Sequence, residues 1–141
     1  MANYYGAWRT NSFRVKSEAK FLEWFQGIDG SAEVRDEGDG YRSIFQSSSS
    51  DDGSIPTHKL VQAHGLFDSE HVNMDIYSDI SEHLRKGEVA VFMEVGHEKL
   101  RYLCGYAVAV RSDGKIITVS IDDIYDKIKT EWGMVADEIG G

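Results

Sequence analysis

The sequence predicts an α+β fold: an antiparallel sheet with a C-terminal three-stranded meander, covered by about three helices. Three runs near the C-terminus are rich in β-branched and other apolar residues, and short polar turns separate them. Three other segments repeat apolar residues at the spacing of an amphipathic helix. Because strands and helices do not alternate strictly, an antiparallel sheet with packed helices is favoured. The 141 residues fit a single domain, 1–141, with a sizeable core.

The first half of the chain predicts a strand, a helix, a hairpin and a further short strand. Ser17 is a suitable N-cap for the helix because its hydroxyl can accept an orphan backbone N–H. Gly38 and Gly40 provide the positive φ that the hairpin turn needs. Residues 66–75 are ambiguous. The expected positions are a strand at 11–16, a helix at 17–27, a hairpin at 31–46 and a strand at 58–62.

The second half of the chain predicts the centre of the sheet. Its three strands should form an antiparallel meander, and they are apolar on both faces, which is typical of interior strands. Gly87 and Gly133 are placed to end the two helices that flank the meander. The expected positions are a helix at 75–86, strands at 88–95, 100–110 and 115–120, and a helix at 121–132.

Acidic residues are concentrated in the middle of the chain. Residues 29–84 carry twelve Asp or Glu against three Lys or Arg, which equals the whole net charge of −9. Such a field repels nucleic acid and attracts basic surfaces. Ten of these acids form the set that we considered for binding: Asp36, Glu37, Asp39, Asp51, Asp52, Asp68, Glu70, Asp75, Asp79 and Glu82.

A candidate binding face lies in the second half of this acidic set. Asp75, Asp79 and Glu82 are four and three residues apart, so they should share one face of the predicted helix and point into solvent. Like charges at this spacing destabilise a helix by a few tenths of a kcal/mol per pair, which suggests that the charge has a use. Solubility alone is the competing interpretation. The predicted acidic face comprises Asp51, Asp52, Asp68, Glu70, Asp75, Asp79 and Glu82.

Glu94 is a second candidate because it is an acid inside an apolar strand. Desolvation there can move a carboxyl pKa towards neutrality, as a general acid or base requires. However, the expected turn register places Glu94 opposite Arg101 and Cys104 opposite Val91, which favours a structural ion pair. The alternative is a small enzyme or ligand-binding domain with a pocket around Glu94, Arg101 and Tyr102.

Several function classes are disfavoured by the sequence. The five histidines lie six or more residues apart, without the close pairs typical of zinc sites, and no phosphate-binding glycine pattern occurs. We therefore expect no metal or cofactor. The aromatic N-terminus is expected to pack against the sheet rather than to bind nucleic acid directly. A single cysteine, no signal peptide and no membrane-length apolar segment predict a cytoplasmic protein without a membrane partner.

Three stretches of the sequence, Asn3–Val15, Glu88–Tyr102 and Ile121–Asp126, carry a resemblance to a class of proteins. They resemble small acidic proteins of unassigned function from bacteria, phages and mobile elements. Neighbours of such proteins include anti-restriction and anti-CRISPR proteins, some of which imitate the DNA phosphate backbone. The resemblance leaves the acidic middle uncovered and transfers no functional residue to this chain.

Charge and resemblance together predict a non-enzymatic acidic inhibitor or binding protein. It would occupy the basic groove of a nucleic-acid-handling complex, such as a host defence effector, as a DNA mimic of the anti-CRISPR kind. A continuous acidic face would favour this hypothesis, whereas a pocket with a buried, unpaired Glu94 would favour the enzyme. A third hypothesis is a structural or assembly protein of a mobile element, which would show an extended apolar surface. The oligomeric state is not predicted.

Overall fold

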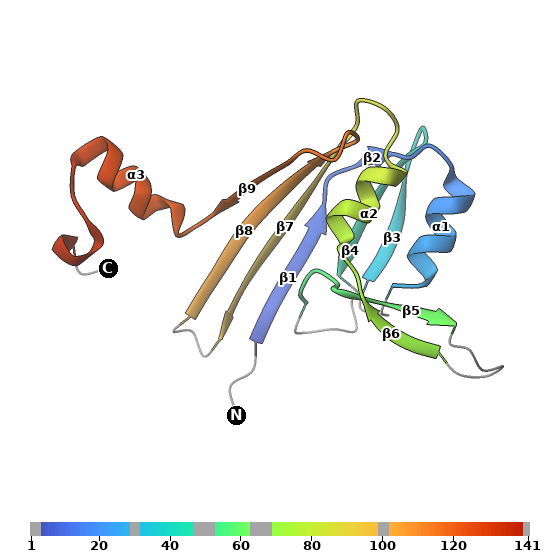
Figure 1. The fold of residues 1–141 in the computed structure, drawn as a ribbon, viewed down its shortest axis with the longest axis horizontal. Coiled ribbons are helices and arrows are strands. Elements are labelled where there is room, and N and C mark those ends of the chain that lie inside the picture. Colours follow the sequence, from blue (N-terminus) through green and yellow to red (C-terminus); the bar gives the residue numbers. More distant parts are fainter. Residues whose placement is uncertain (1–3, 29–31, 47–52, 63–68, 99–101, 140–141) are drawn as a thin grey trace.

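The computed structural model confirms the expected α+β class. It describes residues 4–28, 32–46, 53–62, 69–98 and 102–139 (Figure 1). Within this part of the chain, a seven-stranded antiparallel sheet, a two-stranded sheet and three α-helices are formed. In chain order the elements are β1 (Tyr4–Thr10), β2 (Phe13–Arg14), α1 (Glu18–Gln26), β3 (Ala32–Gly38), β4 (Tyr41–Gln46), β5 (His58–Gln62), β6 (Ser69–Asn73), α2 (Ile76–His83), β7 (Val89–Glu98), β8 (Tyr102–Arg111), β9 (Ile116–Ser120), α3 (Asp123–Trp132) and the 3₁₀ helix η1 (Ala136–Ile139).

The meander β7–β8–β9 forms as expected, but it occupies one end of the large sheet. The strand order is β2-β4-β1-β7-β8-β9. Strands β1 and β2 both pair with one edge of β4, and β3 pairs with its opposite edge. The centre is therefore shared by β7 and β1, which pair over the whole length of β1. The aromatic N-terminus, which was expected to pack against the sheet, is itself one of its central strands, and Trp8 of this strand is buried in the core. The expected strand at 11–16 is reduced to the two residues of β2.

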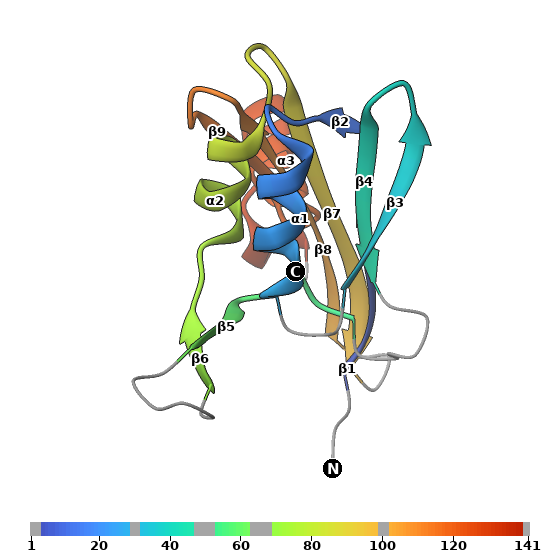
Figure 2. The same cartoon turned by 90° about the vertical axis from the view of Figure 1, so that its right-hand side faces the viewer.

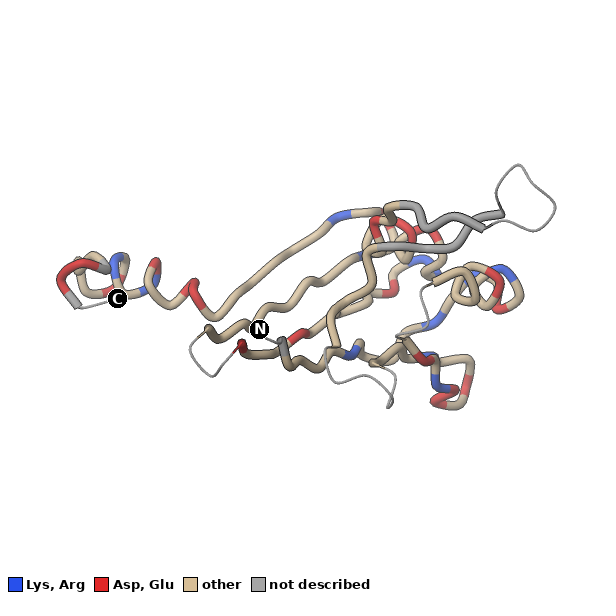
Figure 3. Tube along the Cα trace, turned by 90° about the horizontal axis from the view of Figure 1, so that it is seen from below, with Lys and Arg blue, Asp and Glu red and all other residues tan. Residues whose placement is uncertain are grey.

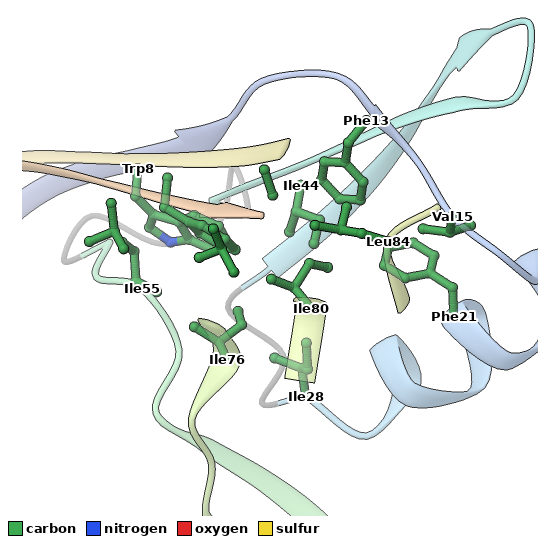
Figure 4. Close-up of a cluster of buried hydrophobic side chains, with 14 of the residues drawn as sticks. Trp8, Phe13, Val15, Phe21, Ile28, Ile44, Ile55, Ile76, Ile80 and Leu84 are labelled. Carbon is green, nitrogen blue, oxygen red and sulfur yellow. The ribbon is translucent and has the colours of Figure 1, made fainter. Parts of the chain in front are cut away.

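Helices α1 and α2 cover one face of the sheet (Figure 2). Ser17 caps α1 as predicted, since its hydroxyl accepts the Lys20 N–H at 3.3 Å. Between the helices and the sheet lies one core, in which Phe13, Phe21, Ile80 and other large side chains are fully buried (Figure 4). This core lies over β1, β4 and β7 and extends to the second half of β8, which contributes Val108 and Val110.

Two helices differ from the expectation in their ends or packing. Helix α2 ends at His83, because Leu84 leaves the helix and forms a β-bridge with Val15, so Gly87 lies in the following turn rather than at the helix end. Helix α3 ends at Gly133, with a φ of 68°, as predicted. However, α3 does not cover the sheet. None of its residues is buried, and it extends beyond β9 (Figure 1).

The register between β7 and β8 also differs from the expectation. Strand β7 continues to Glu98, three residues further than predicted, and the connection to β8 lies outside the described residues. The expected pairs of Glu94 with Arg101 and of Cys104 with Val91 are therefore wrong. The observed pairs are Glu94 with Tyr106, Gly96 with Cys104 and Val91 with Ala109.

Candidate binding surfaces

The strand register divides the side chains of β1, β7, β8 and β9 between two faces. The face that carries Trp8, Phe92 and Val110 packs against the helices and forms the core. We call the opposite side the outer face. Its described positions are Tyr5, Ala7, Arg9, Val89, Val91, Met93, Val95, His97, Leu103, Gly105, Ala107, Ala109, Arg111, Ile117 and Val119.

The outer face is apolar and uncovered. Ile117 is 73% exposed, Leu103 is 68% exposed and Val95 is 60% exposed. Two hollows of about 470 and 540 Å³ lie on it, one beside Ile117 and one beside Val95 and Leu103. No described position of this face carries an Asp or Glu, although the chain has a net charge of −9. The outer face therefore differs from the charged surfaces of the molecule, because its apolar side chains are exposed and its described positions include no acidic residue.

A backbone hydrogen bond to strand β8 holds the chain in place just before helix α3. The Ile121 N–H donates to the Gly105 carbonyl oxygen at 2.9 Å, which extends the β8–β9 pairing by one step. A Cβ atom on Gly105 would lie 2.9 Å from the Ile121 side chain, so the absence of a side chain there allows this close packing. Of the apolar side chains of α3 that follow, Ile124, Tyr125 and Trp132 are exposed, Trp132 to 73%. Ile128 is half-buried. The molecule therefore presents two uncovered apolar surfaces in succession.

The acids predicted to form a face on the second helix have other roles. Asp75 is the N-cap of α2, where its Oδ1 accepts the N–H groups of Tyr77 and Ser78 at 3.1 and 3.3 Å. Asp79 Oδ2 accepts the indole N–H of Trp24 at 3.0 Å and so joins α2 to α1. Asp75 and Glu82 are exposed, as expected, whereas Asp79 is half-buried against α1, so the expectation that all three point into solvent is wrong for Asp79.

Of the remaining four acids of the predicted face, the structure describes only the strand position of Glu70. Asp51, Asp52 and Asp68 lie outside the described residues. Glu70 lies in β6, at the position paired with Val61 of β5. Acidic positions occur along the whole length of the molecule, from α3 to the β3–β4 hairpin (Figure 3). The predicted acidic face therefore remains a hypothesis for these four residues.

The tip of the β3–β4 hairpin carries three further acids, and hydrogen bonds hold the side chains of two of them. Asp36 Oδ1 accepts the Gly38 N–H at 2.9 Å, and Glu37 Oε1 accepts the Ser43 hydroxyl at 2.7 Å. The turn has positive φ at Gly38, Asp39 and Gly40, which confirms the predicted role of its glycines. Arg42, whose side chain is largely buried, pairs with Asp36 and with Glu18 of α1 at 2.6 and 3.0 Å. We call Asp36, Glu37 and Asp39 the hairpin acids; all three are exposed.

Glu94 lies in the core rather than in an open pocket. It is only 6% exposed, and its Oε1 accepts the Ile55 N–H at 2.6 Å. Tyr106, its partner across the strands, also forms a hydrogen bond with the Glu94 carboxylate. Burial, together with the neighbouring Tyr77 and Glu94, raises the pKa of Tyr106 far above its ordinary value, so its hydroxyl keeps its proton.

The pocket expected around Glu94, Arg101 and Tyr102 is not assembled in the described residues. Tyr102 is exposed at the beginning of β8, and Arg101 lies outside the described part. A hollow of about 260 Å³ is instead lined by Tyr77 and Tyr106, together with residues around Ile55 and Met74. Sequence reasoning missed Tyr77 and Ile55 because nothing local links them to a strand some twenty or more residues away.

In the described part of the chain, no group of three or more His, Cys, Asp or Glu side chains is placed to hold a metal ion. Cys104 is a free, partly exposed thiol, and the His97 ring lies 5.6 Å from that of Tyr5. Among the described helices, none combines the length and the hydropathy needed to cross a bilayer.

Comparisons with known proteins add no relative. The sequence matches no protein-family model and no curated protein, and the structure matches no solved structure.

Proposed function

We propose that this chain is a non-enzymatic binding protein that acts through contact with other protein chains. The observation that carries the proposal is the apolar, uncovered outer face of the sheet. Soluble monomers rarely expose a continuous apolar patch larger than a few hundred Å², and larger patches usually mark interaction sites. Burial of such a surface is favourable by roughly 25 cal/mol per Å² of apolar area. The outer face is thus suited to bind protein.

A photo-crosslinking experiment in living cells tests this proposal. A photoreactive amino acid in place of Met93, an exposed side chain of the outer face, should yield products heavier than one chain. The matched control places the same group at Glu23, an exposed position of α1 in the helical layer, where we expect few products. A Met93 position that yields no more product than Glu23 would contradict the proposal.

A second candidate function is the acidic inhibitor of a basic, nucleic-acid-handling complex, which we propose on the basis of the hairpin acids and the net charge. The hairpin acids project at one end of the sheet, where hydrogen bonds hold the carboxylates of Asp36 and Glu37 and Arg42 pairs with Asp36. Carboxylates in a fixed arrangement can pair with Lys and Arg side chains at little additional entropic cost. The negative field would also accelerate the encounter with a basic surface.

Neutral substitutions that preserve the hairpin geometry test the inhibitor hypothesis. Glu37→Gln retains an oxygen for the Ser43 hydroxyl, and Asp39→Asn retains a residue type that tolerates the φ of 55°. The double variant should associate several-fold more slowly with a basic protein captured from a bacterial lysate, and its rate should depend less on salt. Glu23→Gln is the matched control. Equal rates and equal salt slopes in all three proteins would rule the hairpin acids out as a binding surface.

The enzyme alternative receives less support. The hydrogen bonds of Glu94 to Ile55 and Tyr106 give this carboxylate a structural role. A buried carboxylate satisfied by such partners has no evident need of a substrate. The assembly alternative is compatible with the uncovered outer face, and it leads to the next inference.

A further inference from the structure

We infer that the outer face is covered by a second copy of this chain, and that helix α3 of each copy lies on the β7–β8–β9 meander of the other. The inference rests on the proposed function, which requires only that some protein chain contact this face. It specifies that chain. The reasons lie in the helix, in the exposed area and in the charges of the two surfaces.

Helix α3 requires a cover that the described part of its own chain does not supply. Its apolar side chains Ile124, Tyr125, Ile128 and Trp132 recur at helical spacing, yet none of them is buried. Isolated helices shorter than about 12–15 residues are only marginally stable in water, and α3 has 10 residues. An amphipathic helix of this length is therefore expected to be stable only when its apolar side packs against another surface.

The geometry directs α3 away from its own sheet. The Ile121–Gly105 hydrogen bond fixes the point where the chain leaves β9, and α3 then extends beyond this edge strand (Figure 1). Strand β9 is the last strand of the sheet, so a second chain can approach along it. A second copy of the chain has the same uncovered meander and the same uncovered helix. A two-fold exchange satisfies both surfaces at once, which is the self-complementary interface expected of a symmetric dimer.

The exposed area is sufficient for a stable dimer. The apolar residues of the outer face and of α3 that are at least about one-third exposed include Met93, Val95, Leu103, Ile117 and Trp132. Their exposed surface is on the order of 1,000 Å² per copy, whereas a stable interface of standard size buries about 800 Å² per partner. Exchange of α3 would bury most of this area.

The charges of the two surfaces are complementary. The described outer face carries Arg9 and Arg111 but no acid, and Lys115 lies at the rim of its first hollow. Arg111 is paired with Asp113 of the neighbouring turn at 2.6 Å, so the attraction comes chiefly from Arg9 and Lys115. Residues 121–139, which contain α3 and η1, carry six acids against two lysines. Two copies of an acidic protein repel each other over most of their surfaces. The acid-free outer face is where an acidic helix from a second copy meets least repulsion and some attraction.

Molar mass and mixing experiments on the full chain test the exchange. Light scattering coupled to size exclusion should give the wild-type protein twice the mass of one chain. Ile117→Glu damages the sheet surface and Trp132→Glu damages the helix surface, and each should weaken dimerisation at least tenfold. When the two variants are mixed, one of the two contacts in the mixed dimer is fully intact, so the mixture should recover dimer that neither variant forms alone.

The controls separate this inference from the alternatives. Leu22→Glu adds the same charge at a 38% exposed position of α1, and it should leave the dimer intact. Far-UV circular dichroism should show native folds in all variants, because the altered side chains are exposed. A monomeric wild type overturns the inference, and so does a dimer that either variant leaves intact or that mixing does not restore. Crosslinks from Met93 to a different protein would support the proposed function while overturning the second copy.

Discussion

Replacing Phe21 with alanine is expected to lower the free energy of unfolding by about 3–5 kcal/mol. The Phe21 side chain is fully buried. Its ring meets Phe13 of β2 edge-on at 6.0 Å and the His83 ring of α2 at 6.0 Å. The side chain therefore joins α1 to both the sheet and the second helix, and its loss leaves a cavity among three elements. Urea denaturation followed by tryptophan fluorescence measures the effect.

The neighbouring residue provides the control for this prediction. Leu22 occupies the same helix and is 38% exposed, so Leu22→Ala should change the free energy of unfolding by less than about 1 kcal/mol. If Phe21→Ala costs no more than Leu22→Ala, the helices do not pack on the sheet through this side chain. Both variants also leave the outer face unaltered, so an effect on dimer mass would indicate indirect coupling.

The elements that could be predicted from the sequence are those with a local signal. Ser17 lies three residues before the N–H that it accepts, and Gly38 and Gly40 lie in the turn that needs their positive φ. The β3–β4 hairpin and helix α1 followed from these residues. Helix α3 was also predicted close to its observed bounds, because its apolar spacing and Gly133 lie within one short segment.

The features that could not be predicted depend on contacts distant in sequence. Strand β1 pairs with β7 over a separation of more than eighty residues, and the apolar residues of the first segment give no sign of this partner. The register of β7 with β8 depends on where β7 ends, and β7 extends to Glu98 while it pairs with β1. A misplaced turn shifts every pair of the hairpin, which is why Glu94 was assigned the wrong neighbour.

The acidic face illustrates a second limit of sequence reasoning. The spacing of Asp75, Asp79 and Glu82 indicated one side of a helix, but it did not reveal that Asp75 caps this helix or that Asp79 binds a tryptophan of another helix. The apolar side chains of α3 show the same limit. An amphipathic pattern indicates that a helix needs a cover, and it does not indicate which surface, or which chain, provides it.

Glu94→Ala is the second substitution for which we expect a large effect, a loss of about 2–3 kcal/mol in the free energy of unfolding. The carboxylate accepts the Ile55 N–H inside the core, and it also bonds to the Tyr106 hydroxyl. Alanine leaves both donors without this acceptor in a place where water has little access. Hydrogen exchange should show faster exchange of the Ile55 amide, and urea denaturation should show the loss of stability.

Glu94→Gln separates the charge from the hydrogen bond. Its side-chain oxygen can still accept the Ile55 N–H, so the protein should retain more stability than Glu94→Ala, and the Ile55 amide should stay protected. This order follows if the carboxylate attaches the segment around Ile55 to the sheet. If instead both variants are as stable as the wild type, Glu94 is not needed for the fold. A buried carboxylate with no structural role would then be better explained by a ligand in the adjacent hollow of Tyr77 and Tyr106, and the pocket hypothesis would replace the structural one.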